Sequence, residues 1–234
     1  MRKVLILLSA VGLLLSACGS DDGAKKSSDD SKSTATTKAT ADAGGGEALK
    51  PKLLTIEDLP AGFTKSSEDV NNGDADPNKD DSTDGDFCKE LASVAKQYKT
   101  DGEASIEFQT AADASGAGFF NEQLMHFGSK SDAVKGFALF KKALTDQCKD
   151  LTDAESGLTG TFTAMSFPKV VDDTFAVAFN ATQKTGDAEI TLQGQMVTIR
   201  KDNVIGLLFN FGFGSQTLSI KQVEALVHTA AGKL

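Results

Sequence analysis

The chain has 234 residues, of which 40% are hydrophobic, and its formal net charge at pH 7 is -9. This length and apolar content suffice for one globular domain once an N-terminal export signal and a polar tail are set aside. The acidic charge excludes nucleic acid binding and adsorption to anionic lipid headgroups, because a surplus of carboxylates is repelled by both.

The first 17 residues have the pattern of a bacterial export signal. Arg2 and Lys3 precede an apolar run of about a dozen residues, Val4–Leu15, which is too short to span a bilayer comfortably. The run ends in Leu-Ser-Ala-Cys18, which resembles the lipobox of bacterial lipoproteins. We expect residues 1–17 to be a signal peptide and Cys18 to carry the two acyl chains that anchor the chain to the membrane. An ordinary secretory signal with an incidental cysteine is the alternative.

Residues 18–50 are predicted to combine the lipidated cysteine with a disordered tether. They consist mainly of Ser, Thr, Asp, Lys, Ala and Gly, without an apolar period that a folded core could bury. The remainder, residues 51–234, is expected to form a single globular domain.

Six strands are predicted in this domain. They lie at residues 105–110, 119–127, 161–167, 174–182, 188–200 and 204–213. In the last strand we expect Ile205, Leu207, Phe209, Phe211 and Phe213 on one face, and Gly206, Leu208, Asn210 and Gly212 on the other. Short turns between consecutive strands predict antiparallel pairing.

Helices are predicted at residues 87–98, 131–148 and 219–234, capped by Asp86, Ser131 and Ser219. The apolar stripes of the last two comprise Val134, Phe137, Phe140, Leu144 and Cys148, and Ile220, Val223, Val227, Ala230 and Leu234. A helical turn near residue 56 has Thr55 and Asp58 as its capping pair. The expected fold class is α+β, an antiparallel sheet of about six strands packed against helices.

Two cysteines remain for the domain if Cys18 carries lipid. Cys88 and Cys148 both lie on apolar stripes of predicted helices, and an exported domain folds in an oxidising compartment. We predict a Cys88–Cys148 disulfide, worth at most about 4 kcal/mol in the chain-entropy model. Two buried free thiols are the alternative.

Three features in this order resemble the extracellular sensor domains of actinobacterial receptor serine/threonine kinases of the PknH type and their free-standing lipoprotein relatives. They are the opening stretch 54–63, the Ala/Phe/Leu helix ending at Cys148, and Asp172–Phe175 followed by the strand Val197–Ile205 and a C-terminal helix. The resemblance implies an α/β sandwich like that of PsbP and Mog1 proteins, with a surface cleft and no catalysis. Those domains commonly carry two disulfides, and this chain has no kinase domain, so a signalling role does not follow.

Catalytic and metal-binding motifs are absent from the sequence. It has no Gly-x-Ser-x-Gly, His-Glu-x-x-His, Cys-x-x-Cys or Gly-Lys-Ser/Thr. We expect structural or surface roles for His126 and His228. The acidic loop 74–86 contains half of a calcium loop, but Leu91 replaces the bidentate glutamate, so a solvated loop is the expectation. No enzyme activity, cofactor or metal site is predicted.

The sequence favours a lipid-anchored, non-catalytic binding or sensing domain on the extracytoplasmic face of a bacterial cell membrane. Its partner would be an envelope protein or a small lipid-like ligand, and not nucleic acid. The alternative is a lipid or glycolipid carrier with a Phe-lined cavity, since the chain has 15 phenylalanines and no tryptophan.

Overall fold

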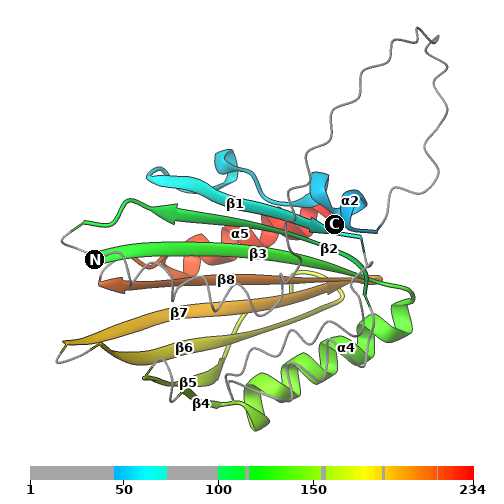
Figure 1. Cartoon of the computed structure of the whole chain (residues 1–234). Coiled ribbons are helices and arrows are strands. Elements are labelled where there is room, and N and C mark those ends of the chain that lie inside the picture. Colours follow the sequence, from blue (N-terminus) through cyan, green and yellow to red (C-terminus); the bar gives the residue numbers. More distant parts are fainter. Residues whose placement is uncertain (1–44, 73–99, 114–115, 154–156, 186–187, 215) are drawn as a thin grey trace, which may run out of the picture.

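The computed structural model describes residues 45–72, 100–113, 116–153, 157–185, 188–214 and 216–234. In these ranges eight strands form one antiparallel sheet in the order β1-β2-β3-β8-β7-β6-β5-β4 (Figure 1). The strands are β1 (Phe63–Asn71), β2 (Thr100–Thr110), β3 (Gly116–Phe127), β4 (Asp150–Asp153), β5 (Leu158–Met165), β6 (Asp173–Thr185), β7 (Ala188–Lys201) and β8 (Val204–Gly214). The helices are α2 (Gly45–Leu49), the short turns η1 (Lys50–Lys52) and η2 (Ile56–Asp58), α4 (Lys130–Lys142) with its π-helical end η3 (Ala143–Gln147), and α5 (Ile220–Lys233). The predicted α+β class is confirmed.

The two strands that the sequence pattern missed lie at the two edges of the sheet. Among the described residues, β1 pairs with β2 alone and β4 with β5 alone. Residues 64–69 of β1 are all polar. An edge strand tolerates such a composition because it needs few apolar contacts, so the sequence gives no strand signal there. β4 has four residues, too few for an alternation to show. The predicted count of about six strands is therefore wrong.

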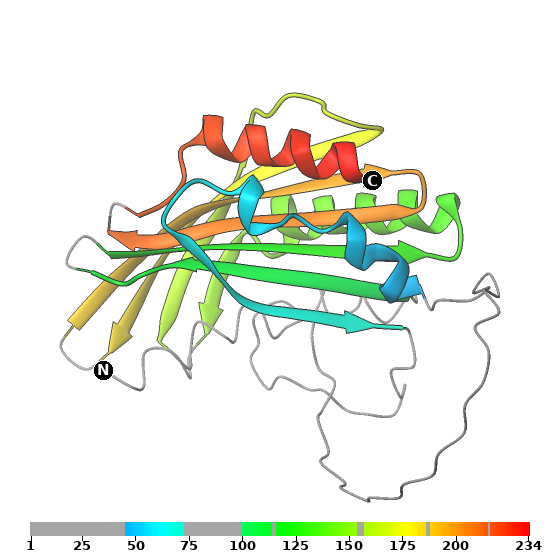
Figure 2. The ribbon, with the colours of Figure 1, turned by 90° about the horizontal axis from the view of Figure 1, so that it is seen from above.

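Each face of the sheet has its own apolar core. α5 and the N-terminal segment, residues 45–59, cover one face, which we call the α5 face (Figure 2). α4 packs on the opposite side, the α4 face (Figure 1). The alternation predicted for β8 is confirmed, because Leu208 joins the core of the α5 face while Ile205 and Phe209 join that of the α4 face. The sheet is thus a layer between two sets of helices.

α4 begins two residues earlier than predicted. Its N-cap is Ser129, whose hydroxyl accepts a hydrogen bond from the backbone N–H of Asp132, and not Ser131. Val134, expected on the buried stripe, is 44% exposed. Its neighbour Ala133 is buried instead, as is Gly136 one turn later, where an added methyl would lie 3.2 Å from the Phe127 ring. These small residues let the helix approach the sheet closely.

α5 starts at the predicted cap. Ser219 and Gln222 form a reciprocal capping box, and Val223 and Val227 are fully buried as expected. Ile220, the first residue of the predicted stripe, is 39% exposed instead. It precedes the first buried turn, where the helix has not yet reached the sheet.

The folded part begins before the predicted boundary at residue 51. Gly45–Leu49 forms α2, and the Leu49 side chain is only 1% exposed in the core of the α5 face. Gly102 of β2 explains how a glycine-rich stretch can pack there, since an added methyl would lie 2.0 Å from the backbone nitrogen of Gly46. Residues 45–50, assigned to the tether from their composition, therefore belong to the fold.

Several predictions fall outside the described residues. These are the signal peptide, the lipidation site Cys18, most of the tether, the acidic loop 74–86, and the helix 87–98 with Cys88. They stay predictions. Across the described part of the chain, no helix has both the length and the apolar character needed to cross a membrane.

Candidate functional site

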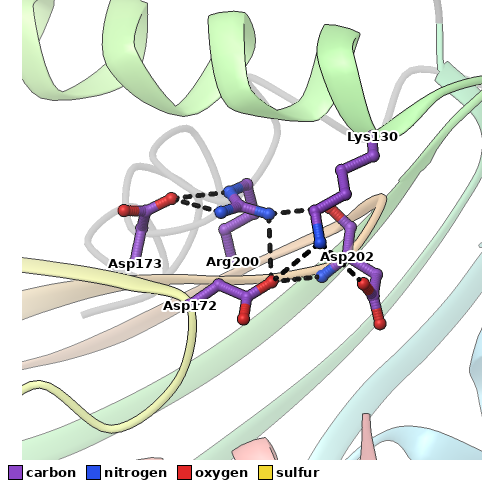
Figure 3. Close-up of polar contacts among 5 residues, drawn as sticks. All are labelled: Lys130, Asp172, Asp173, Arg200 and Asp202. Atoms are coloured by element: carbon purple, nitrogen blue, oxygen red, sulfur yellow. Dashed lines mark hydrogen bonds and ion pairs between the residues drawn. The ribbon is translucent and has the colours of Figure 1, made fainter.

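A polar network joins the two strand turns that carry the family resemblance (Figure 3). Arg200, near the end of β7, donates from Nε and Nη2 to the Asp173 carboxylate, at 2.7 and 2.5 Å. Its Nη1 donates to the Asp172 carboxylate at 3.2 Å and to the Asp202 carbonyl at 2.9 Å. Lys130 of α4 adds an ion pair with Asp202 at 3.1 Å. We call these five residues the Arg200 network.

The Arg200 network acts as a structural clamp. The Arg200 side chain is 6% exposed, and each of its three nitrogens already donates to an acceptor within the chain. Hydrogen bonding from the Asp202 backbone N–H, with the nearby charges of Lys130 and Arg200, lowers the pKa of Asp172 below its usual value. The guanidinium thus holds the start of β6 to the β7–β8 turn, and Lys130 adds α4. This engagement leaves the guanidinium poorly suited to an external anion.

His126 is part of the same end of the sheet. Its Nε2 lies 2.9 Å from the Nδ2 of Asn203, and that amide also donates to the Phe127 carbonyl at 2.9 Å. Because the amide nitrogen is the donor, Nε2 of His126 acts as the acceptor and the proton belongs on Nδ1, which lies 3.6 Å from the Asp101 carboxylate. The ring therefore helps to fix the β7–β8 turn, in keeping with the structural role expected for it.

The remaining sequence candidates are Cys148 and His228. Cys148 is 5% exposed after the end of η3, and its predicted partner Cys88 lies outside the described residues, so the disulfide stays a prediction. His228 is on the exposed side of α5. Among the residues that the structure describes, no three His, Cys, Asp or Glu side chains gather as metal ligands.

A surface pocket of about 670 Å³ opens between the N-terminal segment and strands β1 and β2. We call it the N-terminal groove. Its lining comprises Glu47, Lys50, Pro51, Leu53, Leu54, Thr55, Ile56 and Glu57 from the segment, Lys65 and Glu68 from β1, and Ile106 from β2. The turn that forms one wall is fixed by the predicted capping pair, in which the Asp58 carboxylate accepts from the backbone N–H of Thr55 at 2.8 Å.

Charged side chains line one part of the groove and apolar ones another. Glu68 pairs with both Lys50 and Lys65, each at 3.0 Å, and these hydrogen bonds lower the pKa of its carboxyl. Ile106 is 4% exposed, whereas Ile56 is 40% exposed and presents an apolar side chain to solvent. The groove therefore offers ionic and apolar contacts side by side.

A buried carboxyl lies directly behind the groove wall. Glu122 of β3 is fully buried, and its Oε2 accepts a hydrogen bond of 2.6 Å from the backbone N–H of Leu54. Its Oε1 has no hydrogen-bond partner in the described part of the chain. Burial raises the pKa of Glu122 to about 7, against the smaller lowering effects of the Leu54 hydrogen bond and the positive charge of Lys233.

Lys233, near the C-terminus, ties the same wall to α5. Its Nζ donates to the Leu53 carbonyl at 3.0 Å and to the Asp58 carboxylate at 2.5 Å, and the C-terminus indeed lies next to the N-terminal segment (Figure 2). Glu122 was not among the residues predicted from the sequence, although one signal pointed to it. In the predicted strand, Glu122 shares its parity with Phe120 and Leu124, so a lone carboxylate was due to face an apolar core.

The comparisons support the fold. No family model and no curated protein matches the chain. Among solved structures, the extracellular domain of PknH from Mycobacterium tuberculosis matches with a TM-score of 0.51 and 12% sequence identity, over 81% of this chain and 96% of that chain. At this identity the likeness shows a shared fold and carries no statement about function.

Proposed function

We propose that this chain is a lipid-anchored, non-catalytic binding domain on the extracytoplasmic face of a bacterial membrane, and that the N-terminal groove binds a segment of an envelope protein. The export signal and the lipobox ending in Cys18 support the location and the anchor. The fold likeness to an extracellular domain agrees with that location.

The chemistry of the groove is the observation that carries the proposal. Three glutamates outnumber two lysines, so the groove carries a net negative charge and does not favour a purely anionic ligand. An acyl chain needs an enclosed apolar cavity, whereas this groove is open and partly charged. A polypeptide segment can supply both kinds of contact, with charged side chains near Lys50 and Lys65 and an apolar one at Ile56.

The lipid-carrier alternative rests on the phenylalanines, and these lie mainly on the α4 face. Phe209 and Phe211 stack with ring centroids 4.8 Å apart, and Phe179 meets Phe209 edge-on at 5.8 Å. Phe119 stacks on Phe211 at 5.0 Å. Such contacts are those of rings that pack against one another, so they favour a core role over the lining of a cavity.

Site-specific photo-crosslinking in the native envelope tests the proposal. A benzophenone amino acid replaces Ile56, 40% exposed in the groove, or Val134, a matched control that is 44% exposed on α4. We expect one defined protein adduct from position 56 and none from position 134. Lipid adducts at position 56 would instead support the carrier, and identical adducts at both positions would refute a specific groove.

A charge reversal decides whether an adduct reports specific binding. K65E places a negative charge beside Glu68 and should remove the adduct formed at position 56. K130E is the control, since Lys130 is 61% exposed in the Arg200 network, and it should leave the adduct in place. An adduct that survives K65E would contradict binding through the groove.

A further inference from the structure

We propose that Glu122 is a proton-operated latch on the wall of the N-terminal groove, the stretch Leu53–Leu59. The wall is closed while the carboxyl is neutral, and it opens when the carboxyl ionises. The latch acts on the wall whatever the groove binds, and only its effect on a ligand rests on the proposed function.

The first support is the position of Glu122 in the sheet. On β3 it lies between Ile106 of β2 and Leu208 of β8, its partners in register, and both of these side chains are buried and apolar. The third side is closed by the wall, through Leu54, which is 1% exposed. Leu54, which donates to the carboxyl on one side, lines the groove on the other.

In the part of the chain that the structure describes, Glu122 has no direct ionic partner. Lys233 of α5 and Asp58 of η2 are the charged residues that act on it, and these two bind each other. The ammonium of Lys233 is further engaged by the Leu53 carbonyl. Since β2 and β8 contribute apolar neighbours, the neutral form of the carboxyl is the one that suits the closed wall.

Ionisation makes the closed arrangement costly. A carboxylate with one oxygen unpaired among apolar side chains loses its hydration without full compensation. Displacement of the wall restores water to that oxygen and requires no change in the sheet. Because burial places the pKa of Glu122 at about 7, the transition falls near neutral pH.

Hydrogen exchange on the full chain, purified in detergent, tests the latch. Exchange is followed by mass spectrometry at about pH 5.5 and about pH 8.5, with the intrinsic pH dependence of exchange removed, so that opening alone is compared. In the wild type, protection of the amides in residues 53–59 should fall by about tenfold or more at the higher pH. In E122Q it should stay the same at both.

The loop near Leu218 is the internal control. Its backbone N–H donates to the fully buried Asn210, a neutral side chain, so its protection should not depend on pH. An unchanged wall in the wild type, or an equal change in E122Q, would overturn the latch.

A second variant covers the case in which E122Q does not fold. E122M also removes the titratable carboxyl and keeps a similar volume among the apolar neighbours, so protection of residues 53–59 should be the same at both pH values. Protection that still falls at the higher pH in E122M would refute the assignment. The crosslinking at position 56 reads ligand binding separately, so either proposal can fail while the other stands.

Discussion

Replacing Glu122 by glutamine should remove a loss of stability that the wild-type chain undergoes as pH rises. The pKa of Glu122 is raised from an ordinary 4.5 to about 7 in the folded chain, so between these values the folded state binds more protons than the unfolded state. The contribution of this group to stability is therefore greatest below about pH 4.5 and is lost as pH rises through about 7. A shift of about 2.5 pH units corresponds to about 3 kcal/mol. This figure is an upper one, because opening of the wall relieves part of the cost.

Urea denaturation followed by far-UV circular dichroism, at about pH 4.5 and about pH 8, measures the effect. Other carboxyls also change with pH. Partners lower the pKa of Glu68, and burial raises that of Glu103. Both contributions are common to the two proteins, so the free energy of unfolding of the wild type minus that of E122Q isolates Glu122.

We expect this difference to fall by up to about 3 kcal/mol between the two pH values, in favour of E122Q at the higher one. A difference that stays constant within about 0.5 kcal/mol would refute the reasoning. It would mean that Glu122 titrates normally, which requires water or a hydrogen-bond donor at the oxygen that has no partner in the described part of the chain.

Three further predictions address the scaffold and the anchor. Gly102→Ala should destabilise the chain by about 2 kcal/mol, because the new methyl would lie 2.0 Å from a backbone nitrogen of α2. Gly232→Ala is the control and should not destabilise the chain, since its methyl would meet open space. Equal effects of the two variants in urea denaturation would contradict the close approach. Arg200→Met should lower the free energy of unfolding by about 2 kcal/mol, because Arg200 is buried with several charge-assisted hydrogen bonds. Lys130→Met should lower it by less than about 0.5 kcal/mol, because Lys130 is exposed. The reverse order in urea denaturation would show that the clamp depends on the exposed lysine. Cys18→Ala should abolish labelling with a palmitate analogue and release the chain from the membrane fraction, and a variant that remains labelled would exclude the lipobox assignment.

The sequence predicts a segment of this fold well where burial gives the segment a clear hydrophobic period, and poorly where it does not. β8 was predicted correctly because both of its faces are buried, so its period-2 pattern distinguishes two apolar sets. β1 was missed because its flank is exposed and its residues are polar. The predicted stripe of α4 starts at Val134, whereas the buried residues of this turn are Ala133 and Gly136. Such small side chains give little hydrophobic signal in the sequence.

The groove was beyond sequence reasoning for a different reason. Its lining unites residues 47–57 with Glu68 and Ile106, which come together only through the register of β1 and β2 and through the position of the N-terminal segment. Part of that segment has the composition of a flexible linker, because it contains Gly45 and Gly46. These glycines pack directly against Gly102 of β2, a close approach that no local sequence pattern reveals.

The residues behind the family resemblance divide into two groups with different roles. Asp172, Asp173 and Arg200 clamp two strand turns and α4, and their donors and acceptors are used within the chain. The opening stretch 54–63 builds the wall of the groove through its capped turn. Neither group includes Lys65 and Glu68, the charged residues of β1 that line the groove. At 12% identity the likeness to the PknH domain shows a shared fold alone, so ligand specificity in this chain must be tested at its own groove residues on β1.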